Sequence, residues 1–293
     1  MTDKETRNGF IAITTGVALL GTGPIFVKTV NANGIIVGFY RMLFAGVMLT
    51  IPALYEMRKK PATGSSKPNW GWALMGSLVY AVNIALWCTA LNFTTASAVT
   101  LLDTTAPVWV GLFGWLFLGK KNPGSYWLGL AITLVGAAMT VGFNSLGIGN
   151  VQFKGNMIAL ASGFSYAAYI IFTRRARETV SAVKYSWLVG VVGAAALFIV
   201  SAISGLLNDP LPLRNYLLIA LMALTSQVVA WVLVNHALGV LPPAAGSVAL
   251  VGQPIVTTLL GALLIGEYFT WLQALGGVIC LAGILIVQLT VKP

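Results

Sequence analysis

The chain has 293 residues, of which 58% are hydrophobic and 8% are charged, and its mean hydropathy is +0.88. A soluble domain carries about 25% charged residues, so this composition excludes a soluble globular protein and predicts an integral membrane protein. The net charge of +10 does not indicate a nucleic-acid partner, because the basic residues lie in short gaps between apolar runs.

Long apolar runs follow one another along the chain and predict membrane-spanning helices. Inside a bilayer the backbone polar groups must be satisfied within the segment, and a helix of about 20 residues does this. The first run is long and lacks a small-residue cleavage motif, so it is interpreted as a span rather than as a signal peptide. Ten spans are predicted, at residues 10–29, 35–55, 70–92, 96–118, 124–143, 155–173, 183–206, 213–238, 243–265 and 270–291.

The basic residues between the spans predict the orientation. With the N-terminus inside, the outer segments hold Lys28, Lys154 and Arg214. The inner segments then hold Lys4, Arg7, Arg58, Lys59, Lys60, Lys67, Lys120, Lys121, Arg174, Arg175, Arg177, Lys184 and Lys292. By the positive-inside rule, both termini are therefore expected in the cytoplasm.

Two charged residues lie well inside the predicted spans, Arg41 in the second and Asp103 in the fourth. A charge at the centre of a spanning helix costs about 2.5–3.5 kcal/mol, so both residues are candidates for function. Counted from the outer ends of their helices, each lies about 10 Å deep at the helical rise. Their similar depth and opposite sign predict an ion pair or a gate at the outer mouth. Separate snorkelling to the outer interface is the alternative.

Polar and aromatic residues on several spans predict a substrate cavity. Tyr80, Asn83 and Trp87 share one helical stripe, in which aromatic rings supply contact area and an amide supplies orientation. An aromatic belt with interhelical hydrogen bonds is the alternative. The further candidates are Ser165, Tyr166 and Tyr169 in the sixth span, Gln227 and Trp231 in the eighth, and Gln253 in the ninth. In the first span, residues 21–24 (Gly-Thr-Gly-Pro) predict either a break that exposes carbonyls or close packing of small residues.

A repeated sequence relates the two halves of the chain. Residues 107–120 match residues 254–267, with proline, leucine and glycine in register. An odd number of spans separates the copies, so they cross the membrane in opposite directions. The expected fold is all-α, with ten transmembrane helices as two inverted five-helix repeats, residues 1–147 and 148–293. Pro107 and Pro254 are predicted to be hinges, because proline lacks the N–H of a helical hydrogen bond.

This pattern resembles the drug/metabolite transporter superfamily, in particular its EamA-domain exporters. The resemblance rests on Arg41, on Pro107 with Gly119, on Pro254 with Gly266 and Glu267, and on glycine-rich fifth and tenth spans. Within the superfamily the chain looks most like bacterial exporters of aromatic amino acids. The resemblance implies a central cavity between spans 1–4 and 6–9, alternating access, and a bacterial inner membrane. Lys120 departs from the family pattern, since many relatives carry an acidic residue at that position.

The sequence contains no set of residues typical of an enzyme: no metal-ligand cluster, no glycine-rich nucleotide loop and no nucleophile with a base partner. Neither a cofactor nor a metal is therefore expected, and the expected partners are the bilayer and a small-molecule amino-acid substrate. The expected function is export of neutral and aromatic amino acids and similar small metabolites. A multidrug exporter, or an exporter of other small metabolites, is the alternative. Proton-coupled and facilitated transport both stay open, as does the oligomeric state.

Overall fold

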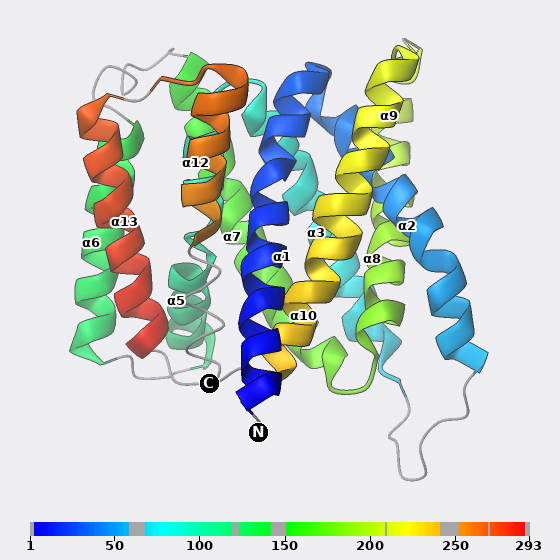
Figure 1. Ribbon diagram of the computed structural model, residues 1–293, viewed down its shortest axis with the longest axis horizontal. Coiled ribbons are helices and arrows are strands. Elements are labelled where there is room, and N and C mark those ends of the chain that lie inside the picture. Colours follow the sequence, from blue (N-terminus) through cyan, green and yellow to red (C-terminus); the bar gives the residue numbers. More distant parts are fainter. Residues whose placement is uncertain are drawn as a thin grey trace.

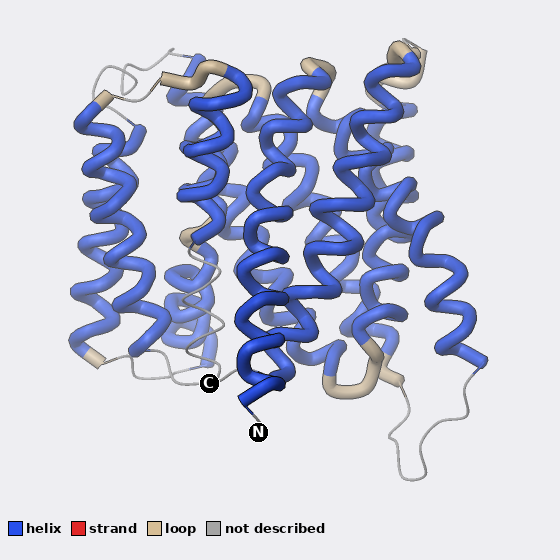
Figure 2. The backbone as a smooth tube through the Cα atoms, viewed as in Figure 1, coloured by secondary structure: helices blue, strands red, loops and turns tan. Residues whose placement is uncertain are grey.

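The computed structural model of the chain describes residues 3–58, 68–118, 123–141, 151–208, 210–240, 252–268 and 270–290. All regular elements in these ranges are helices, thirteen in number, and they lie side by side in one bundle (Figures 1 and 2). They are α1 (Asp3–Val30), α2 (Gly34–Arg58), α3 (Trp70–Leu91), α4 (Ala96–Asp103), α5 (Ala106–Leu118), α6 (Gly124–Val141), α7 (Val151–Arg177), α8 (Ala182–Ile203), α9 (Leu213–Met222), the π-helix η2 (Ala223–Val229), α10 (Ala230–Val240), α12 (Gly252–Ile265) and α13 (Trp271–Thr290).

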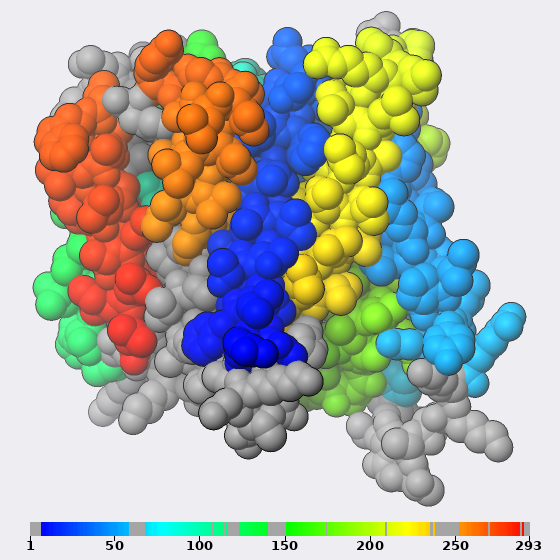
Figure 3. Space-filling model, viewed as in Figure 1, coloured from blue at the N-terminus to red at the C-terminus, as the bar shows by residue number. Residues whose placement is uncertain are grey.

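Seven helical stretches in the described ranges are long and apolar enough to cross a membrane, and three shorter apolar helices accompany them. The multi-pass prediction is therefore confirmed, whereas the count of ten crossings stays a prediction. Large apolar side chains cover the outside of the bundle, for example Ile51, Ile203 and Leu263, which are 80%, 83% and 79% exposed. Such a surface suits lipid rather than water. Figure 3 shows one face of the bundle, on which α13, α12, α1, α9 and part of α2 are visible.

Glycines allow α6 and α13 to pack closely at one edge of the bundle (Figure 1). A Cβ atom at Gly136 would lie 2.2 Å from the Cys280 backbone nitrogen, and one at Gly283 would lie 2.4 Å from the Thr133 nitrogen. Both distances are shorter than any real carbon contact. Small residues bring backbones together in lipid, where apolar burial alone does not drive association between helices.

The fourth predicted span is interrupted near its middle. Helix α4 ends at Asp103, residues 104 and 105 form a turn, and α5 starts at Ala106, one residue before Pro107. Proline has no N–H to donate to the carbonyl four residues earlier, which at Pro107 is that of Asp103, where α4 ends. The kink expected at Pro107 is thus a short break. The side chain of Pro107 itself lies outside the described residues.

The other two expected irregularities, at residues 21–24 and at Pro254, have different outcomes. Helix α1 runs unbroken from Asp3 to Val30 with Pro24 inside it, so a break at residues 21–24 was wrong. Instead, the Gly21 carbonyl accepts a hydrogen bond from Thr257 Oγ1 at 3.1 Å, which fits the close-packing alternative. Pro254 lies in the first turn of α12, and residues 241–251 before it lie outside the described residues.

Glu267 joins three helices where α12 ends. Gly266 adopts a left-handed conformation (φ +66°), and the Glu267 amide donates to the Gly261 carbonyl at 3.0 Å. Glu267 Oε1 accepts from the Ala96 amide in the first turn of α4 at 2.8 Å, and it lies 3.6 Å from Lys28 Nζ of α1. A carboxylate at a helix N-terminus satisfies a free amide and interacts favourably with the helix dipole.

Candidate functional site

A buried polar cluster lies where α2, α3, α4, α7 and η2 meet. Arg41 enters it from α2 and is 5% exposed, so it does not snorkel to the interface. Its Nη2 donates to Gln227 Oε1 at 2.8 Å, and its guanidinium carbon lies 5.1 Å from the centre of the Trp87 ring. A cation over an indole face is an attractive arrangement inside a protein. Arg41 is therefore held by an amide and an aromatic ring rather than by a carboxylate.

Gln227 also binds the middle of α3. Tyr80, 3% exposed, donates its hydroxyl hydrogen to Gln227 Oε1 at 3.2 Å. The amide lies in η2, a π-helical segment of seven residues. π-helical turns are rare and are frequent at functional sites. Tyr80 and Gln227 are 147 residues apart, the same offset as between the repeated residues 107–120 and 254–267, and the structure brings them into direct contact.

Asp103 forms the second part of the cluster, at the end of α4. Ser162 Oγ of α7 donates to Asp103 Oδ1 at 2.6 Å, and Asn83 Nδ2 of α3 donates to the same oxygen at 3.2 Å. Asn83 Nδ2 also lies 2.9 Å from Ser162 Oγ and 3.0 Å from the Ser162 carbonyl. Both partners lie near the middle of their helices, so the carboxylate sits well inside the bundle.

The predicted ion pair between Arg41 and Asp103 is wrong. The salt bridges among the described residues are Lys28–Glu267 and Arg175–Glu178. Arg41 instead binds Gln227, while Asp103 is held by neutral donors from α3 and α7. Depth along each helix could be counted from the sequence, but the direction in which each side chain points could not.

Tyrosine rings line the cluster on the side of α7. The Tyr80 and Tyr169 ring centres are 4.5 Å apart, and those of Tyr166 and Tyr169 are 5.9 Å apart. Tyr185 of α8 stacks on Tyr169 at 6.2 Å, and its hydroxyl lies 2.7 Å from Thr173 Oγ1. Tyr185 was not among the predicted residues. It lies near the start of α8, where an aromatic residue resembles an ordinary interfacial one.

The remaining predicted residues lie apart from these contacts. Trp231 packs against the α1–α10 contact formed by Leu20, Ala230 and Val234. Ser165 and Gln253 are half-buried and take part in none of the hydrogen bonds of the cluster. The structure thus brings together eight of the predicted residues: Arg41, Tyr80, Asn83, Trp87, Asp103, Tyr166, Tyr169 and Gln227.

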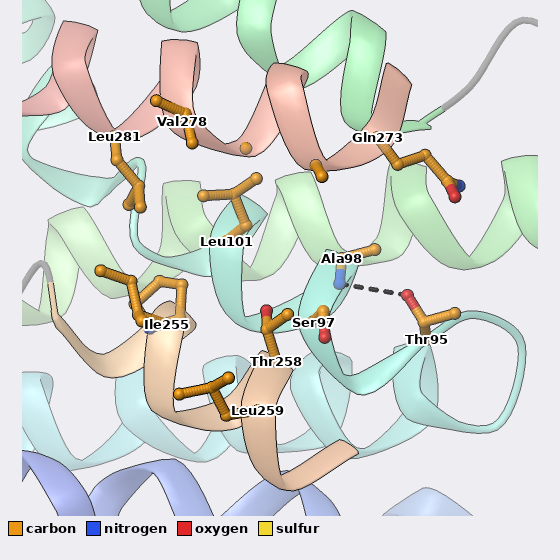
Figure 4. A pocket seen from close by; sticks show the side chains of 13 residues that line it. Thr95, Ser97, Ala98, Leu101, Ile255, Thr258, Leu259, Gln273, Val278 and Leu281 are labelled. Carbon is orange, nitrogen blue, oxygen red and sulfur yellow. Dashed lines mark hydrogen bonds between the residues drawn. The ribbon is translucent and has the colours of Figure 1, made fainter. Parts of the chain in front are cut away.

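A separate apolar groove of about 270 Å³ lies between α4, α12 and α13 (Figure 4). Leu101, Ile255, Leu259 and Leu281 line most of it, with Pro254 at its wall. Of the predicted residues it includes Pro254 alone, and it contains no charged side chain. Its chemistry suits an acyl chain better than a polar solute. We therefore place the candidate substrate site in the polar cluster and not in this groove.

Comparison with known proteins identifies a family of transporters. The model of the EamA-like transporter family matches residues 7–142 and 153–289. The chain is 25% identical over 266 residues to the uncharacterized transporter YwfM of Bacillus subtilis (strain 168), covering 88% of this chain and 85% of that protein. It is also 25% identical over 281 residues to an uncharacterized transporter of Archaeoglobus fulgidus, covering 96% of each.

A solved protein structure shares the fold. It superposes with a TM-score of 0.62 at 15% identity and covers 99% of this chain and 98% of that chain. At this identity the likeness concerns the arrangement of helices alone. This likeness therefore carries no information on the substrate.

Proposed function

Because the chain belongs to the EamA-like transporter family, we propose that this multi-pass membrane transporter exports neutral and aromatic amino acids and similar small metabolites by alternating access. We further propose two inverted halves, residues 1–147 and 148–293, in a bacterial inner membrane with both termini in the cytoplasm. The similarity to bacterial exporters of aromatic amino acids belongs to the same proposal.

The buried cluster around Tyr80, Asn83 and Gln227 is the observation that supports this substrate class. Two side-chain amides and a serine hydroxyl offer neutral hydrogen-bonding groups in the middle of the bundle. Tyrosine rings beside them offer flat apolar area. A few placed polar groups beside aromatic surface are typical of sites for small amphiphilic molecules. One arginine and one aspartate leave the formal charge of the cluster balanced.

Alternating access requires helices that bend near the site. Helix α4 stops at Asp103 and α5 restarts at Ala106, so a movement at this break would displace a residue of the cluster directly. Broken helices at matching places in two halves are typical of carriers with a midplane site. We therefore propose Pro107 as a hinge, with Pro254 as its counterpart at the start of α12.

A flux assay in proteoliposomes tests the function. Uptake of Trp, Phe, Leu, Glu and a cationic dye is measured with and without a pH gradient. We expect Trp and Phe to be fastest, and we expect Asn83→Ala to lower their flux at least tenfold. Leu263→Ala, on the lipid-facing surface of α12, is the control and should match the wild type. Flux of the dye but of no amino acid would refute the proposal. Glu flux equal to Phe flux would refute the idea that the neutral groups of the cluster select substrates with neutral side chains.

A multidrug exporter is the second candidate, and one observation favours it. The rings of Tyr80, Tyr166 and Tyr169 adjoin one another, and Asp103 is bound by Asn83, which lies three residues after Tyr80 on α3. Aromatic faces with a nearby carboxylate attract organic cations. The dye in the flux assay distinguishes this candidate, because its transport should then depend on Asp103 and should not compete with Phe.

A further inference from the structure

Arg41 has unsatisfied hydrogen-bonding capacity in the middle of the bundle. Its Nη2 atom donates to Gln227, but Nε and Nη1 are buried and have no hydrogen-bond partner among the described residues. Leaving one buried donor unpaired costs about 1–3 kcal/mol, and more for a charged group. A guanidinium has five N–H donors and no acceptor, so only an acceptor group can complete it.

No described group in direct contact with Arg41 carries a negative charge. Gln227 and the Trp87 ring are neutral, and the Cys88 thiol beside the guanidinium is at most a weak acceptor. The described part of the chain places no carboxylate within salt-bridge distance of it. Buried charges in proteins are normally paired. An anionic group brought by a ligand would supply both the missing charge and the missing acceptors.

Asp103 shows the complementary pattern. Its hydrogen bonds with described residues both end on Oδ1, and both donors, from Ser162 and Asn83, are neutral. Within the same part of the chain, no cation pairs with it. A cationic donor from a ligand would compensate this carboxylate in the way that an anion would compensate Arg41.

Helix α3 fixes the relation between the two charges. Tyr80 binds Gln227, the partner of Arg41, and Asn83 binds Asp103. Tyr80 and Asn83 are three residues apart, so their Cβ atoms lie about 5–6 Å apart on one face of the helix. The positive and negative groups thus flank a single helical turn, with the Tyr80–Tyr169 pair beside it. An α-amino acid carries its carboxylate and its ammonium group on one carbon atom, next to the side chain.

We infer that Arg41 binds the carboxylate and Asp103 the ammonium group of the transported molecule, so that the substrate is recognised as a zwitterionic α-amino acid. The inference rests on the proposed function and assigns contacts to both charged residues, which the sequence had suggested as gate residues. The tyrosines then receive the apolar side chain. Each charge-assisted contact adds discrimination that a neutral site lacks.

Binding to full-length protein in detergent tests the assignment by calorimetric titration with three ligands. Phenylalanine carries both charges, phenylalanine amide lacks the carboxylate, and N-acetylphenylalanine lacks the ammonium group. The variants are Arg41→Gln, Arg41→Lys and Asp103→Asn, with Arg175→Gln on the exposed surface as the control. Each protein is first checked by size-exclusion chromatography and thermal unfolding.

The expected pattern is a change in selectivity and not only in affinity. Wild type and Arg175→Gln should bind phenylalanine at least about tenfold more tightly than either analogue, the effect of about 1.4 kcal/mol. In Arg41→Gln the preference over the amide should fall to about one, with the affinity for the amide unchanged. In Asp103→Asn the preference over the N-acetyl compound should fall to about one. If Arg41→Gln does not fold, Arg41→Lys should keep a weakened preference over the amide.

Other outcomes overturn the inference in distinct ways. If the wild type binds phenylalanine but Arg41→Gln weakens phenylalanine and its amide equally, Arg41 is structural and the proposed function stands. The same holds for Arg41→Lys if its preference over the amide is as strong as in the wild type. N-acetylphenylalanine bound as tightly as phenylalanine would exclude Asp103 as an ammonium contact. If the wild type binds no amino acid in titration and transports none in liposomes, the proposed function fails as well.

Discussion

Gln227 is the hydrogen-bond partner of Arg41, the positively charged residue of the cluster. One of its atoms, Oε1, accepts hydrogen bonds from both Arg41 and Tyr80. The two bonds differ in kind, because the first has a charged donor and the second a neutral one. Hydrogen bonds to charged groups contribute about 1.5–3 kcal/mol, and neutral ones about 0.5–1.5 kcal/mol.

We therefore expect Gln227→Leu to destabilise the protein more than Tyr80→Phe does. The leucine would remove the hydrogen-bonded partner of a buried guanidinium, at a cost of about 1.5–3 kcal/mol or more. The phenylalanine would remove one neutral bond and keep the ring against Tyr169, at about 1 kcal/mol. Thermal unfolding of the purified variants in detergent measures the difference. Equal losses would show that the Arg41 bond contributes no more than the tyrosine bond.

Among the helices, α6 and α13 can lie this close because the glycines at their contact have no Cβ atom. The Cβ positions of Gly136 and Gly283 are filled by backbone of the opposite helix. By contrast, a Cβ at Gly277 of α13 would meet nothing within 4 Å. Gly283 and Gly277 of α13 thus differ, because a side chain would collide with α6 at Gly283 and would meet open space at Gly277. The two positions provide a matched comparison.

We expect Gly283→Leu to separate α6 from α13 and Gly277→Leu to be tolerated. Overpacking of this kind costs about 1–3 kcal/mol, and more where the neighbour is backbone. The yield of folded protein after extraction and its thermal unfolding temperature provide the measurement. A Gly277→Leu variant as unstable as Gly283→Leu would mean that chain flexibility, and not the close approach, decides the effect.

The helices themselves were predictable, but their interruptions only in part. Runs of about 20 apolar residues leave the backbone no other way to bond in lipid, so α2, α3 and α8 follow from composition. Pro107 marked the α4–α5 break, because proline removes a specific helical bond. Pro24 gave the same signal, yet α1 continues through it. The π-helix η2 has no local sequence signal, since its residues are ordinary apolar and small polar ones.

At the scale of the whole molecule, the candidate site is assembled from segments that lie far apart in the sequence. Its hydrogen bonds join residues up to 186 positions apart, as between Arg41 and Gln227. Helical periodicity identified the stripe on α3, because periodicity is a property of one helix. It could not identify which stripes face one another, so Arg41 was assigned the wrong partner. Ser162 lies on the same predicted span as the candidates Ser165, Tyr166 and Tyr169, but its role became visible only through its contact with Asp103.

The orientation of the whole molecule can be tested with two single cysteines. The native Cys88 and Cys280 are both buried, so their background labelling should be low. Gly64→Cys lies in the predicted inner loop, outside the described residues, and Asn208→Cys lies after α8 on the predicted outer side. In right-side-out vesicles an impermeant maleimide should label position 208 and should reach position 64 only after permeabilisation. The opposite pattern would reverse the proposed topology.

The π-helical segment η2 has a geometric consequence for the helix that follows it. Each α-helical residue turns the chain by about 100°, so adding or removing one residue rotates everything beyond it by that angle. Gln227 accepts a hydrogen bond from Arg41 of α2, while Ala230 and Val234 lie against Gly16 of α1. Both contacts can form at the same time only with the present number of residues between Gln227 and Ala230. A deletion of one residue within Ala223–Val229 would leave the composition almost unchanged, yet it would turn either the amide or the α1-facing surface of α10 away from its partner.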